Sequence, residues 1–280
     1  MDKKVKQFYA SSKNYLERLK KHDENGYARY IELCRANINF GASILECGCG
    51  VGLSSYLLAK EGFKVTAVDV SPLFISEAKK KYGEQPDLKF IVGNVEHMSF
   101  PGQTFDAVCS IILLEHLTDV KRTLKEMCRV LKNEGLLIID APNFLDPVQH
   151  LTAYIQGKEE EKHKPWEAKT RIGDFFQFIR ITCVVVGKAL GINKKIYYLK
   201  PILSNEESFC GQDFDATWLS NRFDVSNILS ELGFSVQCLF PYDTGGKTIQ
   251  IMRVLGLPEI MQSSYKRMRA SGFVIVGKKK

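Results

Sequence analysis

Three glycines alternate with other residues in Gly48-Cys49-Gly50-Val51-Gly52, directly after the apolar run Ser43 to Cys47. A strand that leads through glycines into a helix can bring backbone N–H groups close to a ligand, because glycine has no Cβ and the first helical turn has free N–H groups. Asp69 follows the loop by about 20 residues, at the end of a second apolar run. A carboxylate there can accept hydrogen bonds from both hydroxyls of a ribose. The spacing therefore predicts a site for a nucleoside-containing cofactor.

The loop departs from two other nucleotide-binding patterns. The dinucleotide fingerprint needs a glycine where Leu53 stands, which argues against NAD. Gly246-Lys247-Thr248 would complete a P-loop only with glycine in place of Pro241.

Two histidines are candidates for a general base. His116 follows a strand predicted over 105–112, and His150 follows one predicted over 135–140. Ligands of parallel sheets bind beyond the carboxyl ends of the strands, and imidazole titrates near neutral pH. We expect His116, and after it His150, to act as a base or to orient a substrate. The alternative for each is a loop histidine that bonds to the backbone.

Strands alternate with helices on both sides of the loop, which predicts a parallel sheet covered on both faces. The predicted strands are 43–47, 64–69, 88–92, 105–112, 135–140, 234–240 and 271–277. The predicted helices among them are 53–61, 72–82, 120–131 and 222–232.

Two parts of the chain depart from this alternation. Residues 1–40 carry apolar positions at helical spacing with a break at Asn25-Gly26, which predicts an N-terminal helical cap of two short helices. The alternation stops after the fifth strand and resumes near 221. We therefore expect a core domain of 41–142 and 221–280, interrupted by a largely helical insertion at 143–220 that is placed to form a lid.

The insertion contains an apolar segment from Phe175 to Ile192, punctuated by Arg180 and Lys188. These two charges exclude a membrane span, which needs about 20 mostly apolar residues. Three interpretations stay open: a helix packed on the sheet domain, a lid over an apolar acceptor, or a helix on a membrane surface with its basic residues at lipid headgroups. The insertion also holds Asp213 and Asp215, which could act as a base, contact substrate or form a turn.

The composition is that of a globular protein, with 45% hydrophobic and 25% charged residues in 280. The formal net charge is +7, from 39 Lys and Arg against 32 Asp and Glu. This fits either an anionic partner or a solvated basic surface. Because the basic residues are spread along the chain with no RNA-binding pattern, nucleic acid is not the expected partner.

Eight cysteines occur without a CxxC pair, so neither a zinc ribbon nor a thioredoxin motif is predicted, and no metal site is expected. Met1-Asp2-Lys3-Lys4 does not lead into an apolar segment, so no signal peptide is predicted. We expect a cytoplasmic protein with reduced thiols, with contact to a membrane surface left open.

Six segments together resemble the class I S-adenosylmethionine-dependent methyltransferases, in the small-molecule branch that includes ubiquinone- and menaquinone-biosynthesis-like enzymes. They are Ile44 to Gly52, Val65 to Pro72, Gly93 to Pro101, Phe105 to Val108, Leu114 to Leu117 and Arg129 to Gly135. The resemblance covers roughly 40–140 and 221–277. It implies an α/β, Rossmann-like, doubly wound and mostly parallel seven-stranded sheet.

The resemblance also implies which residues bind S-adenosylmethionine. The backbones of Gly48, Cys49 and Gly50 would pass the methionine moiety, with Gly52 completing the loop. Glu46 would sit under the loop and bind it or the amino group.

The remaining cofactor contacts are implied along the sheet edge. Asp69 would hold the ribose and Val70 would pack on the adenine. Asn94 and Val95 would meet the adenine edge, and Ser110 or Ile111 the carbonyl and amino side. Many relatives carry Asp where Asn94 stands, but the amide oxygen of Asn can still accept a hydrogen bond.

The sequence thus predicts a methyltransferase that moves a methyl group from S-adenosylmethionine to an O or C atom of a small or lipid-linked acceptor, by in-line displacement. The alternatives are an RNA-modifying methyltransferase and a non-catalytic S-adenosylmethionine-binding protein. The oligomeric state stays open.

Overall fold

The structure is a computed structural model. It describes residues 2–83, 85–147, 151, 154–155, 165–206, 208, 213–239 and 272–280. His150 lies outside these residues.

A seven-stranded sheet forms the centre of the molecule, in the order β3-β2-β1-β4-β5-β7-β6. Its first five strands pair in parallel, and β7 pairs antiparallel with both β5 and β6. The strands are β1 (Ser43–Cys47), β2 (Lys64–Asp69), β3 (Leu88–Val92), β4 (Phe105–Ile111), β5 (Leu131–Pro142), β6 (Phe234–Leu239) and β7 (Gly272–Lys279). The predicted doubly wound, mostly parallel seven-stranded sheet is confirmed.

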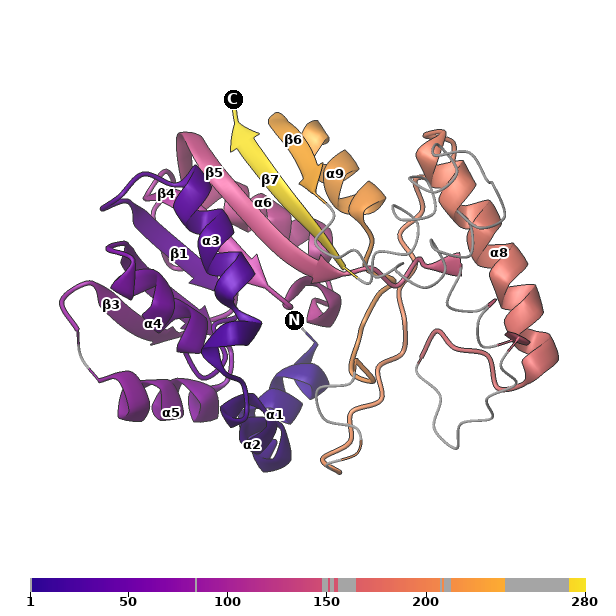
Figure 1. The fold of residues 1–280 in the computed structure, drawn as a ribbon, viewed down its shortest axis with the longest axis horizontal. Helices are drawn as coiled ribbons and strands as arrows, with labels where there is room; N and C mark the ends of the chain where they lie inside the picture. The colour runs from indigo at the N-terminus through magenta and orange to yellow at the C-terminus, as the bar shows by residue number, and fades with distance from the viewer. Residues whose placement is uncertain are drawn as a thin grey trace, which may run out of the picture.

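Helices cover both faces of the sheet, as Figure 1 shows. One face packs on α3 (Ala28–Asn37), α4 (Leu53–Lys60) and α5 (Pro72–Tyr82). The other packs on α6 (Val120–Val130) and α9 (Arg222–Glu231). Central strands are buried on both faces, which explains why β1, β4 and β5 read as nearly continuous apolar runs.

Local signals fix where these helices begin. The side chain of Ser71 accepts a hydrogen bond from Phe74 N, and Pro72 takes the first helical position of α5. Asn221 caps α9 in the same way by accepting from Asp224 N. These short-range contacts explain why the helices predicted over 72–82 and 222–232 are found with nearly the same bounds.

The N-terminal region differs from its prediction. It forms α1 (Lys3–Ser11), α2 (Lys13–Lys20), a short 3-10 turn η1 (Glu24–Gly26) and then α3. Ser12 adds a break that was not predicted, since its side chain accepts from Tyr15 N and so starts a new helix. The helices α1 and α2 lie at the carboxyl edge of the parallel strands (Figure 1).

The described part of the insertion contains one long helix, α8 (Arg171–Ala189), while residues 190–206 and 213–220 run without a helix. The prediction of a largely helical insertion is therefore wrong for these two segments. Residues 213–218 pack against the short 3-10 helix η2 (Leu114–His116), where Thr217 N and Trp218 Nε1 donate to the carbonyl oxygens of Glu115 and Leu114. The insertion thus returns to the carboxyl edge of β4.

Candidate cofactor and acceptor site

The glycine loop turns sharply between β1 and α4. Gly48, Gly50 and Gly52 all have positive φ, at 74°, 53° and 82°. The N–H groups of Gly48 and Cys49 both donate to Val68 O, at 2.7 and 3.1 Å, which ties the loop to the end of β2. A Cβ on Gly52 would lie 2.6 Å from the Phe90 ring. Gly52 therefore allows close packing under the loop. Gly48 and Gly50 line a pocket, and a Cβ on Gly48 would lie 2.7 Å from Leu113 Cδ1 in its wall.

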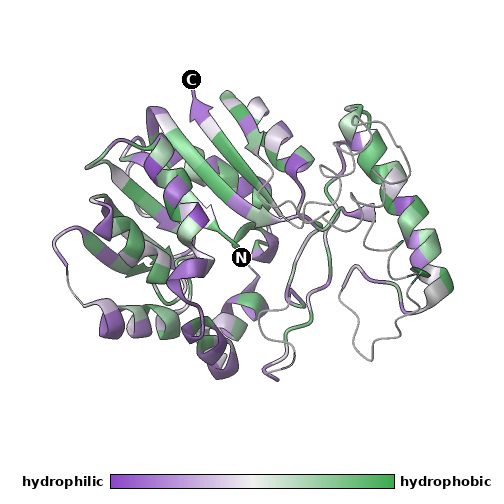
Figure 2. Ribbon diagram, in the orientation of Figure 1, coloured by the Kyte–Doolittle hydropathy of each residue, from purple (hydrophilic) through white to green (hydrophobic). Residues whose placement is uncertain are grey.

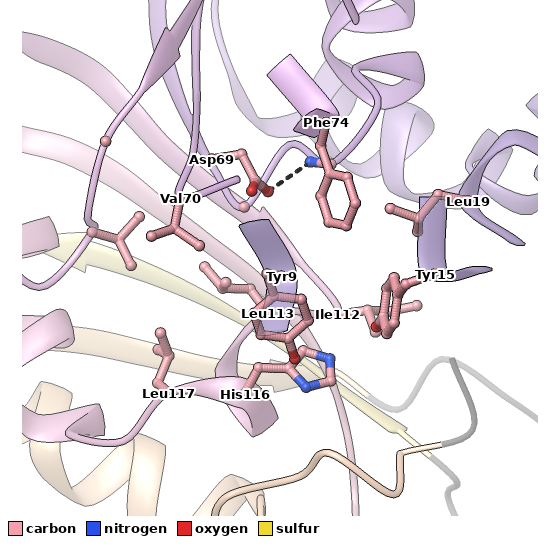
Figure 3. Close-up of a pocket in the computed structure, with 14 residues that line it drawn as sticks. Tyr9, Tyr15, Leu19, Asp69, Val70, Phe74, Ile112, Leu113, His116 and Leu117 are labelled. Atoms are coloured by element: carbon pink, nitrogen blue, oxygen red, sulfur yellow. Dashed lines mark hydrogen bonds between the residues drawn. The ribbon is translucent and has the colours of Figure 1, made fainter. Parts of the chain in front are cut away.

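Asp69 binds the glycine loop and also lines the pocket. Its Oδ2 accepts from Gly50 N at 2.9 Å, as Figure 3 shows, and its Oδ1 accepts from Ser71 N at 2.9 Å. Burial raises the pKa of this carboxyl, while the backbone hydrogen bonds lower it, with a net rise. The side chain is held rigidly by the loop and still lines the pocket.

The pocket encloses about 610 Å³, part of it open solvent. Its lining comes from the glycine loop, the ends of β2 to β4 and, unexpectedly, from α1 and α2 (Figure 3). The lining residues are Tyr9, Tyr15, Leu19, Gly48, Gly50, Asp69, Val70, Phe74, Gly93, Val95, Ile112, Leu113, His116 and Leu117. No described residue of the insertion is among them, whereas the N-terminal helices line one side of the pocket. The role of the insertion as a lid stays a prediction.

The N-terminal helices are fixed over the pocket by specific contacts. Ser71 Oγ donates to Tyr9 O at 2.7 Å, and the Tyr15 ring stacks on Phe74 with 6.0 Å between ring centroids. Ser12 Oγ donates to Asn205 Oδ1 at 2.6 Å, which links the cap to the insertion. The apolar spacing of residues 1–40 predicts helices, but nothing in it says which element they cover.

A buried cluster of acids surrounds His116 at the far side of the pocket. His116 Nδ1 lies 3.5 Å from Asp215 Oδ2, and Nε2 lies 3.5 Å from Glu115 Oε1. Tyr9 Oη donates to the same Asp215 Oδ2 at 2.6 Å, and Figure 3 shows the tyrosine hydroxyl beside the imidazole. Segments from three distant parts of the chain meet here.

The cluster shifts the pKa values of its members. Burial lowers the pKa of His116, but the carboxylates of Asp215 and Glu115 raise it more, so the net change is upward. Burial raises the pKa of Glu115 to about 7, because the nearby His116 offsets only part of the desolvation. Among the described residues, neither carboxylate oxygen of Glu115 has a hydrogen-bond partner. The imidazole is therefore a stronger base than usual, and Glu115 readily holds a proton.

The structure brings about half of the predicted site residues into the pocket lining. Those that line it are Gly48, Gly50, Asp69, Val70, Val95 and His116. Those that lie behind it are Glu46, Cys49, Gly52, Asn94, Ser110 and Ile111. The role of each as a cofactor contact stays a prediction.

Glu46 lies under the loop, as expected, but it is fully buried, and its carboxylate binds side chains of the protein. One carboxylate oxygen accepts from Ser55 Oγ and the other from Tyr30 Oη. It links the end of β1 to α3 and α4, and its predicted contact with the cofactor stays a prediction.

Asn94 also bonds to its own loop, since its Oδ1 accepts from Glu96 N at 3.0 Å. Ser110 and Ile111 belong to β4, and the next residues, Ile112 and Leu113, are the ones that line the pocket. Ile112 has φ of 50°, which is rare for a β-branched residue and turns the chain into the pocket. The sequence pattern could not reveal this backbone turn.

The fold is that of the class I methyltransferases. The solved structure of an S-adenosylmethionine-dependent methyltransferase from Mesorhizobium loti superposes with a TM-score of 0.55 and 15% identity, covering 89% of this chain and 96% of that one. The predicted fold class is thereby confirmed.

The sequence comparison is more specific. Residues 45–139 match the model of the methyltransferase domain family. The chain is 37% identical over 100 residues to 2-methyl-6-phytyl-1,4-hydroquinone methyltransferase from Synechocystis, covering 35% of this chain and 31% of that protein. It is 38% identical over 103 residues to the mitochondrial ubiquinone biosynthesis O-methyltransferase of Schizosaccharomyces pombe, covering 35% of this chain and 37% of that protein.

These matches span only about a third of the length of either curated relative. Within that span, residues 45–139 match a methyltransferase domain, and the resemblance to S-adenosylmethionine-dependent methyltransferases is confirmed for this segment and for the fold. Proteins that this segment resembles are named for S-adenosylmethionine, which is therefore the cofactor expected here.

Proposed function

We propose that this protein is an S-adenosylmethionine-dependent methyltransferase that acts on a small or lipid-linked acceptor. The observation that carries the proposal is Asp69, a carboxylate that lines the pocket while it accepts from the glycine-loop backbone. The loop and the acid thus form one rigid unit, on the domain whose family match is given above.

The lining fits the cofactor chemically. Asp69 would hold the ribose hydroxyls, and the apolar surfaces of Val70 and Val95 would pack on the adenine. Gly50 would leave room for the methionine moiety, since it has no Cβ, and the backbone of Gly48 lines the same part of the pocket. When bound, S-adenosylmethionine supplies an electrophilic methyl group on its sulfonium.

His116 is our candidate for the general base. A hydroxyl or acidic carbon must lose a proton as it bonds to the methyl carbon, and a neutral ring nitrogen of His116 would take that proton. The Asp215 carboxylate would stabilise the imidazolium that forms. His150, the second candidate, stays a prediction from sequence.

Two facts support an apolar, aromatic acceptor. The pocket wall beside His116 is apolar, through Ile112, Leu113 and Leu117. Both curated relatives are named for quinol or ubiquinone chemistry. We therefore propose an apolar, aromatic acceptor of this general kind, methylated at O or C.

Cofactor binding tests the first part of the proposal. We expect S-adenosylhomocysteine to bind the wild type in calorimetry, and Asp69→Ala to weaken binding by roughly 10- to 100-fold, because a hydrogen bond to a charged group is worth about 1.5–3 kcal/mol. Asp87→Ala, on an exposed loop, is the matched control and should bind as the wild type does. A wild-type chain that binds no cofactor would refute the proposal.

Methyl transfer from labelled S-adenosylmethionine to fractionated lipid and metabolite extracts tests the second part. With the acceptor found, His116→Ala should lower turnover by about 10²–10⁴-fold, the usual contribution of a general base. Wild-type turnover should rise with pH, with its midpoint above 6.5, because the surrounding carboxylates raise the pKa of His116 above that ordinary value.

The control for this variant is His97→Ala, which removes an exposed histidine and should leave turnover unchanged. Full turnover in His116→Ala would show that His116 is not the base. Transfer to RNA in place of lipids or metabolites would replace the proposed acceptor class.

A further inference from the structure

The helix α8 presents a continuous apolar stripe to solvent. Its members recur at intervals of three and four residues, so they share one side of the helix. They are Ile172, Phe175, Phe176, Ile179, Cys183, Val186 and Leu190. The exposed fraction is 69% for Ile172 and 65% for Phe176, far above that of a core residue. Figure 2 shows hydrophobic residues along most of this helix, at the edge of the molecule.

The opposite side of α8 already holds the helix to the protein. Ile181 and Val185 are buried in a cluster with Trp166 and Leu219. Lys188 is buried as well and pairs with Asp224 of α9 at 2.5 Å. The exposed stripe is therefore not needed for attachment, although the solvent side of a surface helix is normally polar.

The exposed charges described around the stripe are of one sign. The exposed charged side chains described between 165 and 200 are all basic: Lys169, Arg180, Lys194, Lys195 and Lys200. The two acids in this range are less accessible, since Glu167 is half-buried and Asp174 is buried. An apolar stripe flanked by exposed cations is the pattern of a helix that lies in the interface of an anionic bilayer.

We propose that α8 binds the surface of an anionic lipid membrane, with the apolar stripe in the acyl boundary and the flanking cations at the headgroups. No helix among the described residues could cross a membrane, so the helix lies in the plane of the surface. A second copy of the chain is a poorer partner for the stripe. Pairing two stripes would bring their cations together, and no acid among the residues described between 165 and 200 is exposed to match them.

The position of α8 connects this surface to the pocket. The chain after α8 pairs with the segment that contacts η2, through Leu199 N to Thr217 O and Leu219 N to Tyr197 O, both at 2.8 Å. Thr217 N in turn donates to Glu115 O, beside His116. A membrane-bound α8 would thus hold the acceptor side of the pocket near lipid. The inference itself rests only on the surface of α8 and holds whether or not the chain transfers methyl groups.

Vesicle co-sedimentation of the full chain tests the proposal. We expect binding to vesicles of phosphatidylcholine with about 30% phosphatidylglycerol, weaker binding to pure phosphatidylcholine, and loss with added salt because exposed charges are screened. Phe176→Ser with Ile179→Ser should lower the partition coefficient by at least about tenfold, and Arg180→Glu with Lys194→Glu by a similar factor.

Matched controls come from exposed residues outside α8. Lys79→Glu with Lys80→Glu reverses two exposed charges on α5, and Phe40→Ser removes a phenylalanine that is 85% exposed. Both should bind anionic vesicles as the wild type does. All of the α8 substitutions are at exposed positions, so the melting temperature should change little and serves as the check on folding.

A polarity-sensitive fluorophore on Cys183, in a chain with Cys128→Ser, Cys210→Ser and Cys238→Ser, gives an independent measurement, because Cys183 lies within the stripe. We expect a blue shift on adding anionic vesicles. The proposal fails if vesicles do not bind, if binding is the same in the α8 variants, or if binding does not depend on anionic lipid. It also fails if sedimentation shows a dimer that the stripe variants abolish in the absence of lipid.

Discussion

Glu115 is the residue whose environment is hardest to explain by stability alone. It is completely buried, its carboxylate oxygens have no hydrogen-bond partner among the described residues, and burial raises its pKa to about 7. A polar group left in this state costs free energy. Such groups concentrate at functional sites, and this one lies next to His116 at the pocket.

The pKa of Glu115 predicts a pH-dependent stability difference. The folded state holds the proton more tightly than the unfolded state, whose value is near 4.5, so Glu115 costs stability as pH rises from about 4.5 to about 7. Glu115→Gln should therefore raise the free energy of unfolding by roughly 1–3 kcal/mol at pH 8 and by little at pH 4.5. Urea denaturation at the two pH values measures this. An equal effect at both would contradict the assigned pKa.

At the scale of elements, the turn between β1 and α4 depends on glycine for two separate reasons. Gly48 lets Leu113 pack against the loop, and Gly52 lets α4 approach Phe90 of β3 and Ala78 of α5, whereas Gly50 has no such close neighbour and lines the pocket. The three glycines are evenly spaced in the sequence, but the physical reason for glycine differs from one position to the next.

Substitution of Gly52 separates backbone strain from steric overlap. Gly52→Ala places a Cβ 2.6 Å from the Phe90 ring at φ of 82°. Gly233→Ala has the same kind of backbone, with φ of 85°, but no atom within 4 Å. We expect the Gly233 variant to lose about 1 kcal/mol of unfolding free energy and the Gly52 variant about 1–3 kcal/mol more. Equal losses in thermal or urea denaturation would mean that the Phe90 ring moves away from the new Cβ without a cost in stability.

At the scale of the whole molecule, the insertion is held to the sheet domain by a buried ion pair. Lys188 of α8 donates to Asp224 of α9 and to Lys195 O, at 2.5 and 2.7 Å. The side chains are 0% and 2% exposed. Removing one partner from such a pair leaves an uncompensated buried charge.

Lys188→Met should therefore lower the free energy of unfolding by about 3–5 kcal/mol. Lys188→Met together with Asp224→Asn should recover part of that loss, because the unpaired carboxylate is gone. Lys278→Met breaks a surface pair with Glu134, exposed by 56% and 69%, and should cost less than about 1 kcal/mol. A loss for Lys188→Met as small as that of the surface control would show that Lys188 does not anchor α8.

The parts of the fold that were predicted correctly depend on short-range patterns. Apolar runs place β1 to β7 within a few residues, and caps such as Ser71-Pro72 and Asn221 place the helix starts. The main difference in β5, which begins at Leu131 and not at 135, arises because α6 runs directly into the strand, with no loop between them.

The sequence by itself thus determined the sheet, the glycine loop and the acid at the end of β2, because each is set by residues close together in the chain. Only the tertiary structure decided what covers and completes the pocket. Tyr9 meets Asp215 across 206 residues of sequence, and both meet His116. Contacts of that kind depend on how α1 and the insertion pack on the sheet edge, and packing of distant segments leaves no periodic signal in the sequence.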